Sequence, residues 1–277
     1  MARPLPLWFV PVAVAAVCLM AGCQMRPTYP KVKLADSLQE ILTGEQLKAS
    51  VRLIDHTIAI HLDYADALSQ SELQLGIGPA FDEAIRKVLI AVHRVLLSTD
   101  ADIRFYVVLL SDPTAPGAYL TVVRYLDDVK RANANMIDTP EMFSRTIFEL
   151  NYVGGNPLTL EQYVPRDIRF EEFLTWQLAR RIQHALADEL QTPGVASVGR
   201  CGGQFQNGEF AFTLDVSPVE EQPLDEETLR KVFRTSTNVI AKVLSGYQFE
   251  SFAAVRLTHP LTGRDLVLPK TNLEVFR

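Results

Sequence analysis

Few side chains in this 277-residue chain combine the residue types and spacings that chemistry needs. His61 and Asp63 stand two residues apart, so on a β-strand both would point to the same side and could share a metal ion. Cys201 follows Arg200 and precedes two glycines, and a neighbouring cation lowers the pKa of a thiol. The spacings of zinc sites and of common serine nucleophiles (Cys-x-x-Cys, His-Glu-x-x-His, Gly-x-Ser-x-Gly, Ser-x-x-Lys) occur nowhere.

Each of these candidates has a simpler interpretation. Asp215 takes the place of Asp63 in a second, similar stretch of sequence, where Thr213 replaces the histidine, and a shared aspartate at a strand end fits a turn better than a metal site. No base stands near Cys201 in the sequence, which favours a buried, unreactive thiol. Residues 76–81, GIGPAF, begin like a dinucleotide-binding loop but lack its third glycine, so a turn before a helix explains them. We therefore expect no metal, no cofactor and no catalytic residue, and lean against an enzyme.

The composition is that of a globular protein with an acidic balance. Apolar residues make up 48% of the chain and charged residues 22%, which is enough to bury a core. The net charge of −6 provides no basic surface for phosphates, so we expect no nucleic-acid partner. Of the three cysteines, Cys18 and Cys23 lie at the N-terminus and leave Cys201 without an intramolecular partner. Burial rather than a disulfide framework must stabilise the fold.

An apolar N-terminal segment ends in a cysteine. Residues 7–20, LWFVPVAVAAVCLM, follow one cationic side chain, Arg3, and are shorter than the roughly 20 residues that cross a bilayer. This pattern is typical of a secretory signal peptide. The following residues 19–23, Leu-Met-Ala-Gly-Cys, resemble the lipobox of bacterial lipoproteins, with Met20 where leucine is commonest.

The resemblance covers residues 1–23 only, and it implies a lipid anchor. It implies removal of residues 1–22, attachment of diacylglycerol to Cys23 and acylation of the new terminal amine. Each buried methylene contributes about 0.8 kcal/mol, so several acyl chains hold a protein on the bilayer. Gln24, in place of aspartate, implies the outer membrane facing the periplasm in a two-membrane bacterium. An ordinary cleaved leader and a retained transmembrane anchor remain alternatives.

Beyond a short tether, residues 23–34, the chain contains two similar stretches, residues 35–136 and 167–277, separated by residues 137–166. Four segments recur in the same order in both stretches. The matched pairs are 49–65 with 196–217, 82–96 with 226–240, 102–113 with 249–260, and 117–126 with 263–272. A repeated order of this kind indicates an internal repeat.

Periodicity predicts the elements of each repeat. Asn207-Gly208 between two strand-like runs predicts a hairpin, and Asp55-His56 takes the same place in the first copy. Apolar residues at helical spacing predict helices over 82–96 and 226–240, and the runs 103–110 and 252–258 predict strands, each followed by a short hairpin. A helix is also expected before each unit, near 35–47 and 167–190.

The fold class is therefore α+β, with two tandem pseudo-repeats of about (α)ββαββ, each an antiparallel sheet with helices on one face. Residues 137–166 are expected to form a helical connector. Asp138 or Thr139 caps its helix, and Pro140 stands in the first turn. The buried face of that helix would comprise Met142, Phe143, Ile147 and Leu150.

Trp176 lies off the apolar stripe of the expected helix 167–190, so it is a candidate contact for a partner, although a second buried face would explain it equally. These observations favour a membrane-anchored, non-enzymatic interaction or assembly module that binds another envelope protein. The alternative is an envelope hydrolase or a small-ligand-binding lipoprotein, with its site between the two repeats.

The lipobox resemblance makes a direct prediction about Cys23. Replacing Cys23 by alanine removes the sulfur that the lipid would join, so the chain is expected to persist as an uncleaved precursor without fatty acid. Mass spectrometry of the protein from its own membranes measures both features. Normal maturation of Cys23→Ala would rule out the lipobox.

Overall fold

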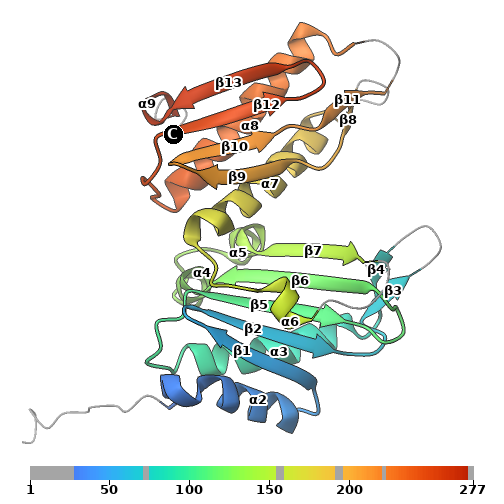
Figure 1. Ribbon diagram of the computed structural model, residues 1–277, viewed down its shortest axis with the longest axis vertical. Helices are drawn as coiled ribbons and strands as arrows, with labels where there is room; N and C mark the ends of the chain where they lie inside the picture. Colours follow the sequence, from blue (N-terminus) through green and yellow to red (C-terminus); the bar gives the residue numbers. More distant parts are fainter. Residues whose placement is uncertain (1–27, 71–74, 154–158, 191–195, 220–222, 274–277) are drawn as a thin grey trace, which may run out of the picture.

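The computed structural model describes residues 28–70, 75–153, 159–190, 196–219 and 223–273, so the expected signal peptide and Cys23 lie outside the described residues (Figure 1). Within these ranges no helix has the length and apolar character that a membrane crossing needs. The fold is α+β, as the sequence predicts: two bodies, each a β-sheet with packed helices, follow one another along the long axis of the molecule (Figure 1).

The helices and strands follow each other as listed here in chain order. The helical segments are η1 (Lys31–Lys33), α2 (Leu34–Gly44), α3 (Phe81–Leu96), α4 (Leu126–Asn133), α5 (Thr139–Arg145), α6 (Leu160–Tyr163), α7 (Phe170–Glu189), α8 (Glu226–Gly246) and α9 (Lys270–Leu273). The strands are β1 (Lys48–Ile54), β2 (Thr57–Asp63), β3 (Leu68–Gln70), β4 (Leu75–Ile77), β5 (Phe105–Ser111), β6 (Ala118–Tyr125), β7 (Ile147–Tyr152), β8 (Ala196–Val198), β9 (Gly202–Gln206), β10 (Glu209–Thr213), β11 (Val216–Pro218), β12 (Ala254–His259) and β13 (Arg264–Pro269). The four main helices that the sequence predicts, α2, α3, α7 and α8, are confirmed.

The two main sheets have the same sequence of pairings over four strands. The first has the order β1-β2-β5-β6-β7, and the second has the order β9-β10-β12-β13. The hairpins β1–β2, β5–β6, β9–β10 and β12–β13 are antiparallel, as expected. The central pairs β2–β5 and β10–β12 are parallel instead. A helix that carries the chain back across the sheet makes the next strand run in the same direction, which the antiparallel expectation overlooked.

Both predicted two-residue turns are present. Gln206 pairs with Glu209, and Asn207 and Gly208 between them have φ of 53° and 77°, which is the backbone that favours these residue types. In the first body Ile54 pairs with Thr57, and Asp55 has φ of 48°. The turn chemistry therefore sets the register of both hairpins.

The first sheet is covered on both faces rather than on one. Ile58 and Ile60 of β2 pack with α2 and α3 in one core cluster, whereas Ala59 belongs to a second cluster on the opposite face. That opposite face is covered by α6 and the start of α7, where Phe173 meets Phe105 with ring centroids 5.3 Å apart. β5 is buried at six successive residues, Phe105–Leu110, which is the pattern of a strand covered on both sides.

The connector contains a strand that the sequence analysis did not expect. Its helix, α5, is short, and Asp138 caps it by accepting a hydrogen bond from the Glu141 backbone N–H at 2.8 Å. Ile147 and Leu150, expected on the buried face of that helix, belong instead to β7, the fifth strand of the first sheet. The sequence IFELNY alternates with period two, so the helical interpretation of these two residues was wrong.

Helix α7 joins the two bodies. Its first turns place Phe170 and Phe173 against Tyr125 of the first sheet, with ring centroids 4.8 Å and 6.2 Å away. Further along, the helix packs on α8 and β9 of the second body (Figure 1). Gly203 of β9 allows this approach, because a Cβ there would lie only 2.9 Å from the Thr175 side chain. One core cluster therefore runs from the first sheet into the second body.

A buried polar network lies at the same junction. Asp128 of α4 accepts hydrogen bonds from Arg145 (Nη1, 2.8 Å) and from the Tyr247 hydroxyl (2.7 Å). Gln177 of α7 donates to the Arg145 carbonyl at 2.6 Å and to the Tyr247 hydroxyl at 2.9 Å. Burial raises the pKa of both Asp128 and Tyr247. We refer to these four residues, which join both bodies and α7, as the Asp128 network.

The Asp128 network predicts a large loss of stability when its carboxylate is removed. Asp128→Ala removes the more buried of the two carboxylates that bind Arg145 at 2.8 Å, the other being Glu141, and it leaves the Tyr247 hydroxyl without its acceptor. We therefore expect the free energy of unfolding to fall by about 3 kcal/mol. Urea unfolding followed by circular dichroism measures it.

The neighbouring carboxylate provides the matched control for this measurement. Asp127 pairs with Arg131 at the surface, at 3.5 Å, so Asp127→Ala is expected to cost only about 0–1 kcal/mol. Equal losses for the two variants would show that the network does not stabilise the junction.

Candidate functional site

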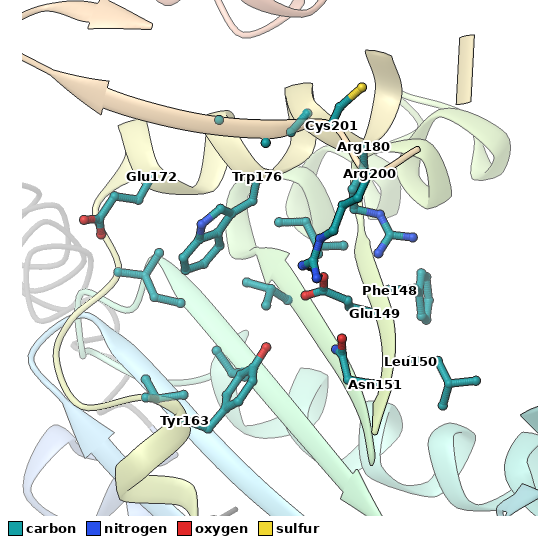
Figure 2. A pocket seen from close by; sticks show the side chains of 18 of the residues that line it. Phe148, Glu149, Leu150, Asn151, Tyr163, Glu172, Trp176, Arg180, Arg200 and Cys201 are labelled. Atoms are coloured by element: carbon teal, nitrogen blue, oxygen red, sulfur yellow. Dashed lines mark hydrogen bonds and ion pairs between the residues drawn. The ribbon is translucent and has the colours of Figure 1, made fainter. Parts of the chain in front are cut away.

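A cleft of about 860 Å³ lies between the two bodies (Figure 2). One wall is a face of α7, and the floor is the face of the first sheet at β5, β6 and β7. The segment 163–168 closes one side, and residues 200–203 at the start of β9 form the opposite edge. The volume lies within the range of about 300–1,000 Å³ that is typical of ligand sites.

The α7 wall presents polar and aromatic side chains at helical spacing. Glu172, Trp176, Arg180 and His184 follow one another every four residues, which places them on the same side of the helix. Trp176 is 44% exposed, and its indole points into the cleft (Figure 2). Of the two interpretations that the sequence leaves open for Trp176, the structure has the exposed side chain and not the second buried face. Other side chains of the helix are buried in the core cluster that both bodies share, among them Phe173, Leu178 and Ile182.

The floor combines β7 with a tyrosine of α6. Glu149 and Asn151 alternate along β7 with Phe148 and Leu150, so the first pair faces the cleft and the second pair points to the opposite side (Figure 2). Tyr163 of α6 stands at the side of the cleft, where burial raises the pKa of its hydroxyl to about 12. The hydroxyl therefore stays protonated at physiological pH and serves as a hydrogen-bonding group.

Two arginines, Arg180 and Arg200, bring positive charge to the side of the cleft near β7. Arg200 spans the opening and forms an ion pair with Glu149 of the floor at 2.5 Å. Arg180 is half-buried, and its pKa is lowered by burial and by the charge of Arg200, against the opposing effect of Glu149. No hydrogen bond or ion pair links Arg180 to another residue in the described part of the chain. The Arg180 guanidinium is therefore available to an anionic group that enters the cleft.

Ion pairs hold the segment 163–168, which closes one side of the cleft, to helix α7. Glu172 at the start of α7 binds Arg166 at 2.5 Å and Arg169 at 2.9 Å. Burial opposes ionisation of this carboxyl, but the hydrogen bonds from both arginines outweigh it and hold the pKa of Glu172 at about 2. The segment that precedes α7 is thereby held to the helix at neutral pH.

The structure does not bring the other sequence candidates into this site. His61 and Asp63 lie on β2, as expected, but His61 Nε2 lies 2.8 Å from the Ser111 hydroxyl and Asp63 binds Lys48 at 2.5 Å. Neither residue lines the cleft. Among the residues that the structure describes, no group of three side chains suited to a metal ion occurs.

Cys201 lies at the edge of the cleft but is not activated. Its side chain is buried, and burial raises the pKa of its thiol, which is opposite to the effect that a neighbouring arginine would have. The Arg200 guanidinium is directed to Glu149 instead (Figure 2). The two glycines after Cys201 begin β9, and Gly203 serves the close packing on α7.

Sequence reasoning found Trp176 but missed Arg180 and Glu149. Arg180 stands four residues after Trp176, so the helical spacing alone contained that signal. Glu149 could not be placed, because its segment was interpreted as a helix. The pairing of Arg200 with Glu149 joins residues 51 positions apart and has no local signature.

No protein-family model, curated protein or solved structure matches this chain. The chemistry of the cleft is therefore the basis for a functional proposal.

The environment of Cys201 predicts a slow thiol. At pH 7.5 we expect its reaction with iodoacetamide to be at least about tenfold slower than that of free cysteine, because burial reduces both access and thiolate. Peptide mass spectrometry after timed alkylation measures the rate at this residue. Unfolding in urea should restore the rate of free cysteine, whereas rapid alkylation of the folded protein would make Cys201 a candidate nucleophile again.

Proposed function

We propose that this protein is a lipid-anchored bacterial envelope protein that acts as a non-enzymatic interaction module, and that the cleft between its bodies binds a partner protein. The observation that carries the proposal is Trp176, which is 44% exposed inside a cleft. It stands one helical turn from Arg180, which has no ion pair with any residue that the structure describes. Tryptophan and arginine are the residue types that contribute most to binding at protein interfaces. The indole supplies apolar area, and the guanidinium selects a carboxylate of the partner.

The start of the folded body supports a position close to the membrane. The Tyr29 carbonyl accepts a hydrogen bond from the Thr99 hydroxyl at 2.6 Å, and the Lys31 backbone N–H donates to Asp100 at 2.8 Å. From Cys23 to Tyr29 the chain spans six residues, or at most about 20 Å. The tether is thus shorter than the expected segment 23–34, and an anchor at Cys23 holds the first body next to the bilayer.

A small anionic ligand is a second candidate for the same cleft, favoured by its volume of about 860 Å³. The hydrolase alternative has no comparable support. No hydrogen bond joins a serine or cysteine of the cleft to a histidine within the described ranges, and the pKa of Cys201 is shifted in the unfavourable direction. An interaction module therefore describes the site better than a catalyst.

A photo-crosslinking amino acid at position 176, in intact cells, tests the proposal. We expect a discrete adduct with one envelope protein, which Arg180→Glu abolishes because it reverses the charge beside the indole. The control position is Ile90 on α3, which is 63% exposed and does not line the cleft. Absence of an adduct at 176, or the same adducts at both positions, would contradict a partner-binding cleft.

Fluorescence distinguishes the second candidate from the first. The chain has two tryptophans, Trp8 in the expected signal peptide and Trp176, so the emission of a mature protein would report on the cleft alone. If the fraction of an envelope extract below about 1 kDa shifts this emission while position 176 crosslinks to no protein, the cleft binds a small ligand.

A further inference from the structure

The two sheets share four strands in the same order but end differently. In the first sheet a fifth strand, β7, pairs with β6 in the antiparallel direction. In the second sheet β13 corresponds to β6. No strand in the described ranges pairs with the outer edge of β13, so a counterpart of β7 is absent there. Figure 1 shows β7 beside β6 in the first body and β13 at the margin of the second.

In the first body β7 extends the sheet beyond β6 and adds side chains to the core on the face that α3 covers. Its Phe148 and Leu150 side chains pack against the same core cluster as Ile85 and Leu89 of α3. As a result, Leu120 of β6 is almost completely buried, with 3% exposure. The fifth strand therefore supplies the last layer of that core.

In the second body the corresponding place, beside β13, is open. Between α8 and β13 lies a hollow of about 640 Å³, and apolar side chains line it from both sides: Leu229, Phe233, Leu266 and Leu268. Leu266 has the place of Leu120 in the pairing pattern, because it pairs with Leu257 as Leu120 pairs with Leu110. Leu266 is only half-buried. The hollow is thus the place that a fifth strand would fill.

The backbone of β13 is also free to pair. The Lys270 N–H donates to the Ala253 carbonyl at 2.9 Å, so the alternation of an antiparallel ladder turns the backbone groups of Asp265 and Val267 outward. These residues correspond to Tyr119 and Thr121, which pair with β7 in the first body. Pro269 lacks an N–H at the next outward position, which limits an added strand to a short segment.

The charged residues around the hollow indicate the charge of a segment that would bind there. Arg230, Arg234 and Arg264 line it together with Glu226 and Asp265. Arg264 is bound to Glu226, whereas neither Arg230 nor Arg234 has an ion pair in the part of the chain that the structure describes. Both of these arginines are exposed on α8. Their charge favours a segment with acidic residues.

We propose that the outer edge of β13 and the hollow between β13 and α8 bind an extended, acidic segment of a partner protein, which adds to the sheet as an antiparallel strand. Main-chain hydrogen bonds to Asp265 and Val267 provide the pairing, and two apolar side chains two residues apart enter the hollow. Carboxylates beside them meet Arg230 and Arg234. This site is separate from the cleft at Trp176 and does not depend on the function proposed for that cleft.

A synthetic peptide with the alternation of β7 tests this docking site. The probe is Asp-Ile-Phe-Glu-Leu-Asn-Asp, which is the sequence of residues 147–151 between two aspartates, with a fluorophore at one end. Fluorescence anisotropy with the full-length protein in detergent is expected to show saturable binding at micromolar peptide. Val267→Pro removes an outward N–H donor and is expected to weaken binding at least about tenfold.

Matched variants separate pairing from misfolding. Val267→Ala keeps the N–H and is expected to bind within about threefold of the wild type. Arg234→Glu is expected to weaken binding more at low salt than at high salt, because the lost contact is electrostatic. Unchanged circular dichroism and unfolding midpoint of Val267→Pro show that its fold is intact, and Trp176→Ala is expected to bind the peptide normally.

Three results would overturn the proposal. They are no binding at about 1 mM peptide, equal affinities of Val267→Pro and Val267→Ala, and a wild-type dimer that Val267→Pro converts to a monomer. The last result would make a second copy of this chain the occupant of the edge. Because the probe does not involve Trp176, each outcome leaves the test of the cleft unaffected.

Discussion

The arrangement of this molecule depends on one helix that belongs to both bodies. The first turns of α7 place Phe170 and Phe173 on the first sheet, and the rest of the same helix packs on β9 and α8. An α-helix is a continuous hydrogen-bonded rod, so neither body can move independently without breaking one of these contacts. The same helix forms one wall of the cleft, so the packing of the junction also fixes the position of that wall.

The Asp128 network makes this junction specific as well as tight. Apolar contacts between aromatic rings tolerate sliding, whereas the hydrogen bonds from Arg145 and Tyr247 to one buried carboxylate require a single geometry. Buried ion pairs add little net stability compared with apolar packing, but one left incomplete is costly. The network therefore penalises other orientations of the second body, and it holds α4, α5, α7 and the end of α8 in register.

Much of the local structure could be predicted from the sequence, and much of the site could not. Asn207-Gly208 defines its hairpin because few residue types accept positive φ, and the apolar stripe of α7 left Trp176 outside the core. The strand β7 was missed because Asp138 and Pro140, which begin the short helix α5, stand a few residues before it. The helix that they indicate was extended too far, over residues 147–150. The packing of α6 and α7 on the second face of the first sheet and the pairing of Arg200 with Glu149 depend on contacts between residues far apart in the chain. The spacing of residues in a single sequence does not encode such contacts.

The two bodies have nearly the same strand order, but their sheets differ at one edge. The first body has the fifth strand β7 and helices on both faces of its sheet, and its described part begins near Tyr29. The second body retains an open edge and a half-covered layer of leucines at the end of the molecule away from α2 (Figure 1). The proposed lipid anchor at Cys23, with a reach of at most about 20 Å to Tyr29, would keep the first body at the membrane surface. The open edge of β13 is the site proposed for a partner segment, in addition to the cleft, whose floor belongs to the first body.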